Sequence, residues 1–253
     1  MSAPLLQVEH LSKAFGKVVT AHNLSFDLHA GEITSIIGPN GAGKSTLINM
    51  LSGSVPVDEG RVLLRGKEIT HLPTHRRVKL GLCRSFQVVN VFPALTVFEN
   101  IQIPVLSKAG KAHHFFRSLS GEVGARERVM EELQRVNLVK QAYTPAGALS
   151  HGDQRLLEVA VALAVQPLLL FLDEPTAGMN PVERIEILGN IRRLSASGRT
   201  TFVIVEHDMD IVFSLSDRVM VLHRGEIVCD GNPDRVKCDE NVRECYLGEE
   251  VCE

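Results

Sequence analysis

A glycine-rich segment that ends in lysine and serine is the first part of the sequence whose residues could carry chemistry. Residues 38–46 read GPNGAGKST and match the pattern GxxxxGK[ST], after a strand-like apolar segment and before a helix-like one. The glycines let backbone N–H groups face phosphate oxygens, and the positive end of the following helix adds to the attraction. Lys44 would reach the β- and γ-phosphates, and Ser45 offers a hydroxyl to Mg²⁺.

This segment therefore predicts a site for the phosphates of a nucleotide and Mg²⁺. The alternative is a glycine-rich turn with an incidental lysine, and the flanking strand and helix argue against it. The expected nucleotide-binding residues are Gly38, Pro39, Asn40, Gly41, Ala42, Gly43, Lys44, Ser45 and Thr46.

Two adjacent acidic residues follow an apolar segment further along the chain. Residues 168–172 read LLLFL, which is typical of a buried strand, and Asp173 and Glu174 come next. Ligands of open α/β sheets bind at the carboxyl ends of strands, so we expect Asp173 to hold Mg²⁺ through water. Glu174 points differently and suits a general base for the attacking water. The alternative is that the pair only caps the turn before Pro175.

The rest of the chain must position these groups. Short alternating segments open it, GRVLLRGKEI reads as a hairpin with its turn near Gly66, and a short helix is expected from Pro73 to near Gly81. After Gly152 we expect a helix at 153–165, strands at 168–172, 200–205 and 218–222, a helix at 182–195, the segment 226–231 and a helical tail. This order predicts an α/β fold with a parallel core and a mostly antiparallel N-terminal β subdomain.

A helical region interrupts the strand-rich parts. TVFENIQIPVL and ARERVMEELQRVNL carry apolar residues at helical spacing. We expect an inserted helical subdomain of about residues 88–165 within one domain that spans residues 1–253. Phe92, Pro93 and Phe98 either form a docking surface on this region or belong to the core of this subdomain.

Composition narrows the classes of function. The 253 residues include 44% hydrophobic and 23% charged residues, which is typical of a globular protein, and the net charge of −3 gives no basic field for nucleic acid. The five cysteines form no CxxC pair and are expected to be reduced thiols of a cytosolic protein. No secretory signal is expected at the N-terminus. The apolar run at 156–172 is interrupted by Glu158, Gln166 and Pro167, so it does not read as a membrane span.

The ordered motifs GPNGAGKST, RSFQ, LSHGDQ, LLLFLDEPTAG and VIVEHD resemble those of the ATP-binding subunits of ABC transporters, over nearly the whole chain. The resemblance implies a P-loop NTPase fold and an ATPase. It implies that Gln87 senses Mg²⁺ and the γ-phosphate, that His207 contacts the γ-phosphate, and that Phe15 stacks on adenine with Val18 beside it. Without the resemblance, Phe15 reads as a core residue, Gln87 as a polar loop residue and His207 as a sheet-edge histidine.

LSHGDQ resembles the signature loop of this family, which binds the γ-phosphate held by the opposite subunit. The residues that the resemblance assigns to this contact are Ser150, His151, Gly152 and Asp153. The commonest signature has Gly in place of His151 and Gln in place of Asp153. The family's Ser-Ala-Leu-Asp loop is replaced by residues 177–180 (AGMN), which puts a contact by Asn180 across the dimer in doubt. A simple helix N-terminus is the alternative for LSHGDQ.

Further segments resemble the ATPase subunits of branched-chain amino-acid importers: GLCRSFQ, VNVFPALTVFEN, DEPTAGMNP, VEHDMD and YLGEE. Importers of urea or other amides share much of this pattern. The resemblance implies a dimer of two copies, or of one copy and a homologous ATPase, which drives transmembrane permease subunits and indirectly serves a solute-binding protein. It places the chain in the cytoplasm, peripheral on the inner face of the cell membrane. The rivals are a soluble ABC ATPase, which usually carries two cassettes or a long coiled coil, and a P-loop kinase or GTPase, which needs neither LSHGDQ nor Gln87.

Overall fold

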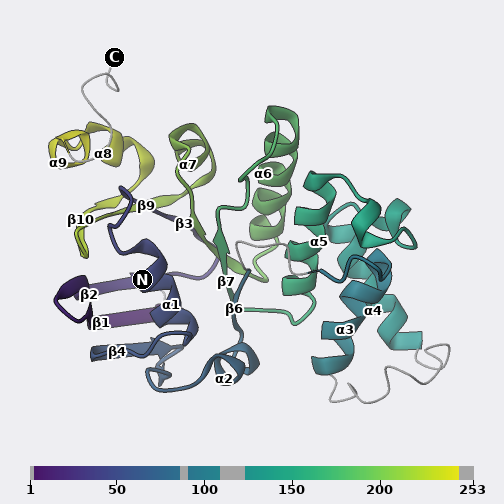
Figure 1. Ribbon diagram of the computed structural model, residues 1–253, viewed down its shortest axis with the longest axis horizontal. Helices are drawn as coiled ribbons and strands as arrows, with labels where there is room; N and C mark the ends of the chain where they lie inside the picture. Colours follow the sequence, from purple (N-terminus) through teal and green to yellow (C-terminus); the bar gives the residue numbers. More distant parts are fainter. Residues whose placement is uncertain (1–2, 86–90, 109–122, 245–253) are drawn as a thin grey trace.

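The computed structural model describes residues 3–85, 91–108 and 123–244, and a six-stranded sheet forms its centre (Figure 1). The strand order is β10-β9-β3-β8-β7-β6, and all neighbours are parallel except β10, which is antiparallel to β9. The strands are β3 (Ile33–Ile37), β6 (Leu82–Arg84), β7 (Leu169–Asp173), β8 (Thr201–Val205), β9 (Arg218–His223) and β10 (Glu226–Gly231). The carboxyl ends of β3, β6, β7 and β8 therefore meet at one edge, where the predicted site residues lie.

The N-terminal part forms a second, antiparallel sheet with the order β2-β1-β4-β5. Its strands are β1 (Leu6–Phe15), β2 (Val18–Leu28), β4 (Glu59–Leu64) and β5 (Lys67–Glu68). β1 and β2 pair from Leu6 with Leu28 to Phe15 with Val18, so Phe15 and Val18 lie at the hairpin end. The expected hairpin with its turn near Gly66 is present as β4 and β5.

Helices cover both faces of the central sheet. They are α1 (Lys44–Ser52), α2 (Thr74–Lys79), α3 (Val97–Lys108), α4 (Val123–Arg135), α5 (His151–Leu163), α6 (Pro181–Ala196), α7 (Met209–Leu215), α8 (Pro233–Cys238) and α9 (Glu240–Val242), with short 3₁₀ turns at Val139–Gln141 and Ala146–Ala148. In Figure 1, α3, α4 and α5 gather at the opposite end of the molecule from the antiparallel sheet. Within the described residues, no helix is both long and apolar enough to cross a membrane.

Alternating side chains of β7 divide between two hydrophobic cores. Leu169 and Phe171 pack with α1 and the antiparallel sheet, whereas Leu170 and Leu172 pack with α3, α4, α5 and α6. This alternation is expected for a strand buried on both faces. It fixes the end of β7 between the two layers, which is where Asp173 emerges.

The predicted fold class, a P-loop α/β core with an antiparallel N-terminal sheet and added helices, is confirmed. The helix α5 is shifted from its expected bounds, because it runs from His151 to Leu163, two residues earlier than the expected 153–165. The reason is a side-chain cap, because Oγ of Ser150 accepts a hydrogen bond from the amide of Asp153 at 3.1 Å and so starts the helix directly after Ser150. The division at about residues 88–165 into a separate helical subdomain stays a prediction.

Candidate ATP-binding and hydrolysis site

A cavity of about 350 Å³ lies at the carboxyl edge of the central sheet. Its lining comes from the loop after β3, the first turn of α1, the ends of β7 and β8, and one residue of β2. The residues are Thr20, Asn40, Gly41, Ala42, Gly43, Lys44, Ser45, Thr46, Asp173, Glu174, Val205 and His207. The structure therefore brings together the predicted phosphate-binding segment, both acidic residues and the histidine, although up to 167 positions separate them in the sequence.

Backbone contacts on two sides fix the shape of the loop at residues 38–46. Gly38 has a φ of +148° and Gly43 a φ of +105°, and a Cβ atom would lie 2.0 Å from the Leu222 carbonyl oxygen at Gly38 and 2.1 Å from the Thr20 carbonyl oxygen at Gly43. Only glycine fits both the angle and the space. The turn between β9 and β10 supports the loop further, because the Gly225 amide donates to the Ala42 carbonyl at 2.9 Å.

Lys44 points back over this loop from the first turn of α1. Its Nζ donates to the carbonyl oxygens of Gly38 at 2.6 Å and Pro39 at 3.0 Å. Burial lowers the pKa of Lys44, and the charges of Glu174 and Asp173 oppose that shift. The ammonium is thus placed among acceptors at the loop that the sequence predicts to hold phosphates.

Asp173 ends β7 and is nearly fully buried. Its Oδ2 accepts a hydrogen bond from Nη2 of Arg84, the last residue of the neighbouring strand β6, at 2.7 Å. Arg84 stands within the motif RSFQ, but sequence reasoning gave it no role. No local pattern could have found this pair, because its members are 89 residues apart.

Glu174 lies directly beside His207. Its Oε1 is 3.0 Å from Nε2 of His207, and both side chains are partly exposed to the cavity. The backbone of Glu174 is in the left-handed region, with a φ of +47°, and is held there by two hydrogen bonds: its amide donates to Val205 O at 2.8 Å, and its carbonyl accepts from Arg155 at 2.9 Å. A backbone held in this sparsely populated region is common at functional sites. The result is a carboxylate and an imidazole that face one cavity together.

A second carboxylate, which sequence reasoning missed, joins the segments that carry Glu174 and His207. Glu206 is buried, and its Oε1 accepts from the amide of Thr176 at 3.0 Å and from its hydroxyl at 2.7 Å. It therefore fixes the chain after Glu174 to the residue before His207. The only signal in the sequence is its position in the motif VEHD.

The two residues expected near adenine lie outside the lining of this cavity. Phe15 and Val18 are exposed at the end of the β1–β2 hairpin, and Thr20, two residues further along β2, is the strand's contribution to the cavity. Nζ of Lys13 lies 5.2 Å from the centroid of the Phe15 ring, a cation–π contact. The stacking of Phe15 on adenine stays a prediction. Gln87 lies outside the described residues.

The signature segment begins α5 and does not line the cavity described above. Ser150 caps the helix, His151 is exposed, Gly152 is buried, and Asp153 lies in the first turn. A Cβ atom at Gly152 would lie 3.2 Å from Glu183 Cγ, so the first turn of α5 packs closely on the start of α6. Asn180 caps α6 with its Oδ1, which accepts from the amides of Val182 and Glu183. The contact of this segment with a partner's ATP stays a prediction.

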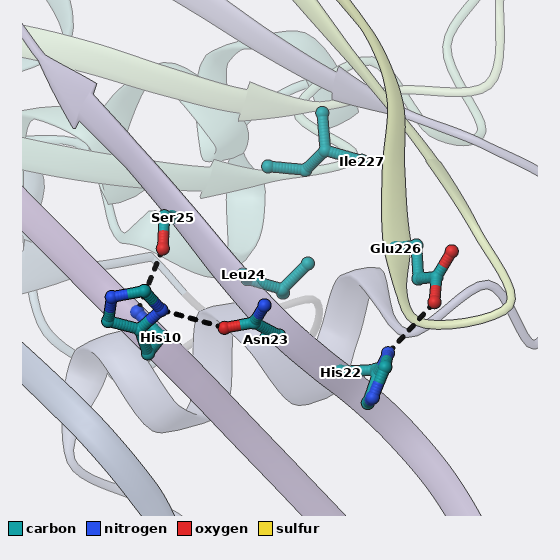
Figure 2. Close-up of a pocket in the computed structure, with 7 residues that line it drawn as sticks. All are labelled: His10, His22, Asn23, Leu24, Ser25, Glu226 and Ile227. Atoms are coloured by element: carbon teal, nitrogen blue, oxygen red, sulfur yellow. Dashed lines mark hydrogen bonds and ion pairs between the residues drawn. The ribbon is translucent and has the colours of Figure 1, made fainter.

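A separate cavity of about 420 Å³ lies at the edge between β2 and β10, and Figure 2 shows its side chains. Its polar groups are paired with one another: Nδ1 of His10 lies 2.8 Å from Oδ1 of Asn23, and Nδ1 of His22 lies 2.8 Å from Oε1 of Glu226. The amide of His22 also donates to the Gly225 carbonyl at 2.8 Å. The contacts in this cavity therefore hold β2 against the β9–β10 turn, which in turn contacts the loop at residues 38–46.

The three residues considered for docking differ in their environment. Phe92 and Pro93 are exposed, whereas Phe98 packs against the helical core and its ring is stacked on Tyr143 with the centroids 6.0 Å apart. The structure thus favours the core interpretation for Phe98 and leaves Phe92 at the surface. Docking of a partner there stays a prediction.

Comparison with known proteins agrees with this geometry. The family model described as ABC transporter matches residues 21–177. The chain is 37% identical to the high-affinity branched-chain amino acid transport ATP-binding protein LivG of Escherichia coli (strain K12), with 98% of this chain and all of LivG covered. It is 36% identical to the corresponding protein BraF of Pseudomonas aeruginosa over the same shares.

Solved structures agree as well. An ATP-binding cassette of an ABC transporter in its ADP conformation has a TM-score of 0.86 and 32% identity, over 98% of this chain and all of that chain. A dimeric ATP-binding cassette bound to ADP and Pi has a TM-score of 0.74 and 25% identity, over 90% of this chain and 98% of that one. The chain therefore belongs to the ABC transporter family, and it is an ATPase subunit similar to LivG and BraF.

Proposed function

We propose that this protein is the ATP-hydrolysing subunit of a membrane importer for branched-chain amino acids. The observation that carries the proposal is the single cavity that joins the phosphate-binding loop, Lys44, Asp173, Glu174 and His207. The substrate class is supported by the full-length likeness to LivG and BraF, whose names describe branched-chain amino acid transport. An importer of urea or another small amide is the alternative.

In this proposal the loop at residues 38–46 binds the phosphates of ATP through its backbone N–H groups. The positive end of α1 and the ammonium of Lys44 add attraction for the negative charge. Phe15, with Val18 beside it, supplies an exposed apolar surface on which adenine stacks. The position of Thr20 in the same cavity supports this, since it lies on β2 between that surface and the loop.

The oxygen donors of the cavity fit Mg²⁺. Ser45 contributes a hydroxyl and Asp173 a carboxylate, and Mg²⁺ prefers such ligands together with water and substrate phosphate oxygens. Gln87 is proposed as a further ligand. The bound metal would neutralise charge on the phosphates.

Glu174 acts as the general base that orients and deprotonates the attacking water. His207 lies at hydrogen-bonding distance from Glu174 in this structure. When ATP is bound, the imidazole N–H of His207 contacts the γ-phosphate, where it stabilises developing charge. Gln87 senses Mg²⁺ and the γ-phosphate. A positioned base contributes about 10²–10⁴-fold to the rate.

Hydrolysis in this proposal requires a second subunit. Ser150, His151, Gly152 and Asp153 lie at the positive end of α5 and do not line their own chain's cavity, so they are available to a phosphate held by a partner. A similar solved cassette bound to ADP and Pi is described as dimeric. The partner is a second copy or a homologous ATPase.

The ATP-dependent dimer drives transmembrane permease subunits from the cytoplasmic face of the membrane. The exposed Phe92 and Pro93 support docking of the permease near the helical region of residues 88–165, and a solute-binding protein delivers the cargo on the other side. Loss of the γ-phosphate removes contacts between subunits and resets the transporter. No role for nucleic acid is proposed.

The test begins with purification of the tagged protein from its native membrane together with any permease that it holds. The complex in lipid vesicles, supplied with ATP and its binding protein, should accumulate leucine, isoleucine and valine, and Lys44→Ala should abolish this. Accumulation of urea or an amide in place of leucine would support the alternative. Recovery of no membrane protein, with ATPase activity that membranes do not change, would contradict the transport function.

A second measurement tests the shared site. ATPase activity per molecule should fall on dilution below the dimer's dissociation constant, and Ser150→Ala should lower turnover without changing ATP affinity of the dilute protein. A single dilute copy that hydrolyses ATP at the full rate would contradict the shared site.

A further inference from the structure

A largely buried guanidinium lies against the carboxylate that we propose to hold Mg²⁺. Nη2 of Arg84 donates to Oδ2 of Asp173 at 2.7 Å, and the two side chains are only 14% and 3% exposed. Nη1 of Arg84 donates to Oδ1 of Asn49 in α1. Arg84 therefore connects the helix of the phosphate-binding loop to the strand that carries the acidic pair.

Burial makes this contact important for the charge of Asp173. A carboxylate removed from water is strongly destabilising unless a partner compensates its charge. In the part of the chain that the structure describes, two other cations come near. Lys44 donates to the carbonyls of Gly38 and Pro39, and Arg155 donates to the backbone oxygen of Asp173 at 3.4 Å. The guanidinium that hydrogen bonds the carboxylate itself is that of Arg84.

We propose that Arg84 is a positioning residue that serves as the resident counter-ion of Asp173. It holds the carboxylate in one orientation while no metal is bound, and it shares the same negative charge with Mg²⁺ once the metal arrives. The hydrogen bonds among the described residues engage Oδ2 of Asp173, which leaves Oδ1 for a second partner. This inference rests on the proposed magnesium role of Asp173.

The first test measures the ion pair without metal or nucleotide. In EDTA, Arg84→Gln and Asp173→Asn should each lower Tm by about 6–20 °C, because each leaves one buried charge unpaired. The fall in Tm of the double variant should be smaller than the sum of the falls of the two single variants, since two neutral amides remain. The matched control is Arg76→Gln, which removes the charge of an exposed arginine in α2. Additive losses, or a loss at Arg84 no larger than at Arg76, would overturn the counter-ion role.

A charge-preserving variant covers the case in which Arg84→Gln does not fold. Arg84→Lys keeps the positive charge but loses the planar fork that reaches both Asp173 and Asn49. It should therefore be less stable than the parent and more stable than Arg84→Gln. A lysine variant less stable than the glutamine variant would contradict the role of the charge.

The second test compares the Tm of parent and Arg84→Gln with ADP, in EDTA and in Mg²⁺. The rise in Tm on adding Mg²⁺ should be larger in Arg84→Gln than in the parent, because the metal gives Asp173 the positive partner that the substitution removed. An equal or smaller rise in the variant would overturn the inference and leave the proposed function standing. If the parent itself shows no Mg²⁺-dependent rise, the proposed magnesium site fails instead.

Discussion

Replacement of Gly43 by alanine tests how the phosphate-binding loop is held. The added Cβ would lie 2.1 Å from the carbonyl oxygen of Thr20, a backbone atom of β2, whereas real Cβ contacts essentially never fall below 3.0 Å. The loop must therefore move by at least about 0.9 Å. Where geometry is tight, a misplacement of about 1 Å lowers a reaction rate by on the order of 100-fold. We expect ATP affinity to fall by about the same factor, which corresponds to about 2.8 kcal/mol.

A control variant separates this displacement from the cost of the backbone angle. Gly66 also has a positive φ, +74°, but a Cβ there meets nothing within 4 Å, and it lies in the β4–β5 turn. Gly66→Ala should lose about 1–2 kcal/mol of stability and retain full ATP affinity. Unfolding in urea and titration calorimetry with ATP measure both quantities. A folded Gly43→Ala protein that binds ATP within threefold of the parent would refute the packing of the loop on β2.

Three further variants test other parts of the site and its support. Glu174→Gln should lower ATP turnover by about 10²–10⁴-fold, while ATP still binds and dimers last longer. The exposed Glu127→Gln is the control. Turnover of Glu174→Gln within tenfold of the parent would contradict the assignment of Glu174 as general base. Arg77 is fully buried and donates to the carbonyls of Met50, Leu51, Thr70 and Leu72. Arg77→Met should therefore lower the free energy of unfolding by about 3 kcal/mol or more. The exposed Arg76→Met is the control and should lower it less. Burial raises the pKa of the Cys83 thiol from 9.0 to about 11, so the unfolded thiol loses its proton first and stability should fall between pH 9 and 11. In urea unfolding, Cys83→Ala should reduce this fall in the free energy of unfolding by up to about 2.7 kcal/mol. An unchanged dependence of that free energy on pH would contradict the effect of burial on the thiol.

Contacts between distant segments explain what sequence reasoning missed at this site. Arg84 and Asp173 belong to adjacent parallel strands joined by a long crossover, and Glu206 meets Thr176 across 30 positions. Neither pair follows a helical or strand periodicity, so no pattern predicts it. The same holds for Thr20 and Gly225, which both contact the loop at residues 38–46.

What the sequence determined by itself is local. The loop at residues 38–46 could be predicted because its glycines and the helix that follows are consecutive in the chain, and the position of Asp173 because an apolar strand leads directly to it. The capping of α5 by Ser150 depends likewise on neighbours along the chain. Only the tertiary structure decided which charges meet, since the packing of distant segments gives Asp173 its guanidinium partner and places His207 beside Glu174. It also leaves Phe15 at the surface. The physical reason is that hydrogen bonds along one segment are set by its own residues, whereas the pairing of buried charges depends on how separate segments pack.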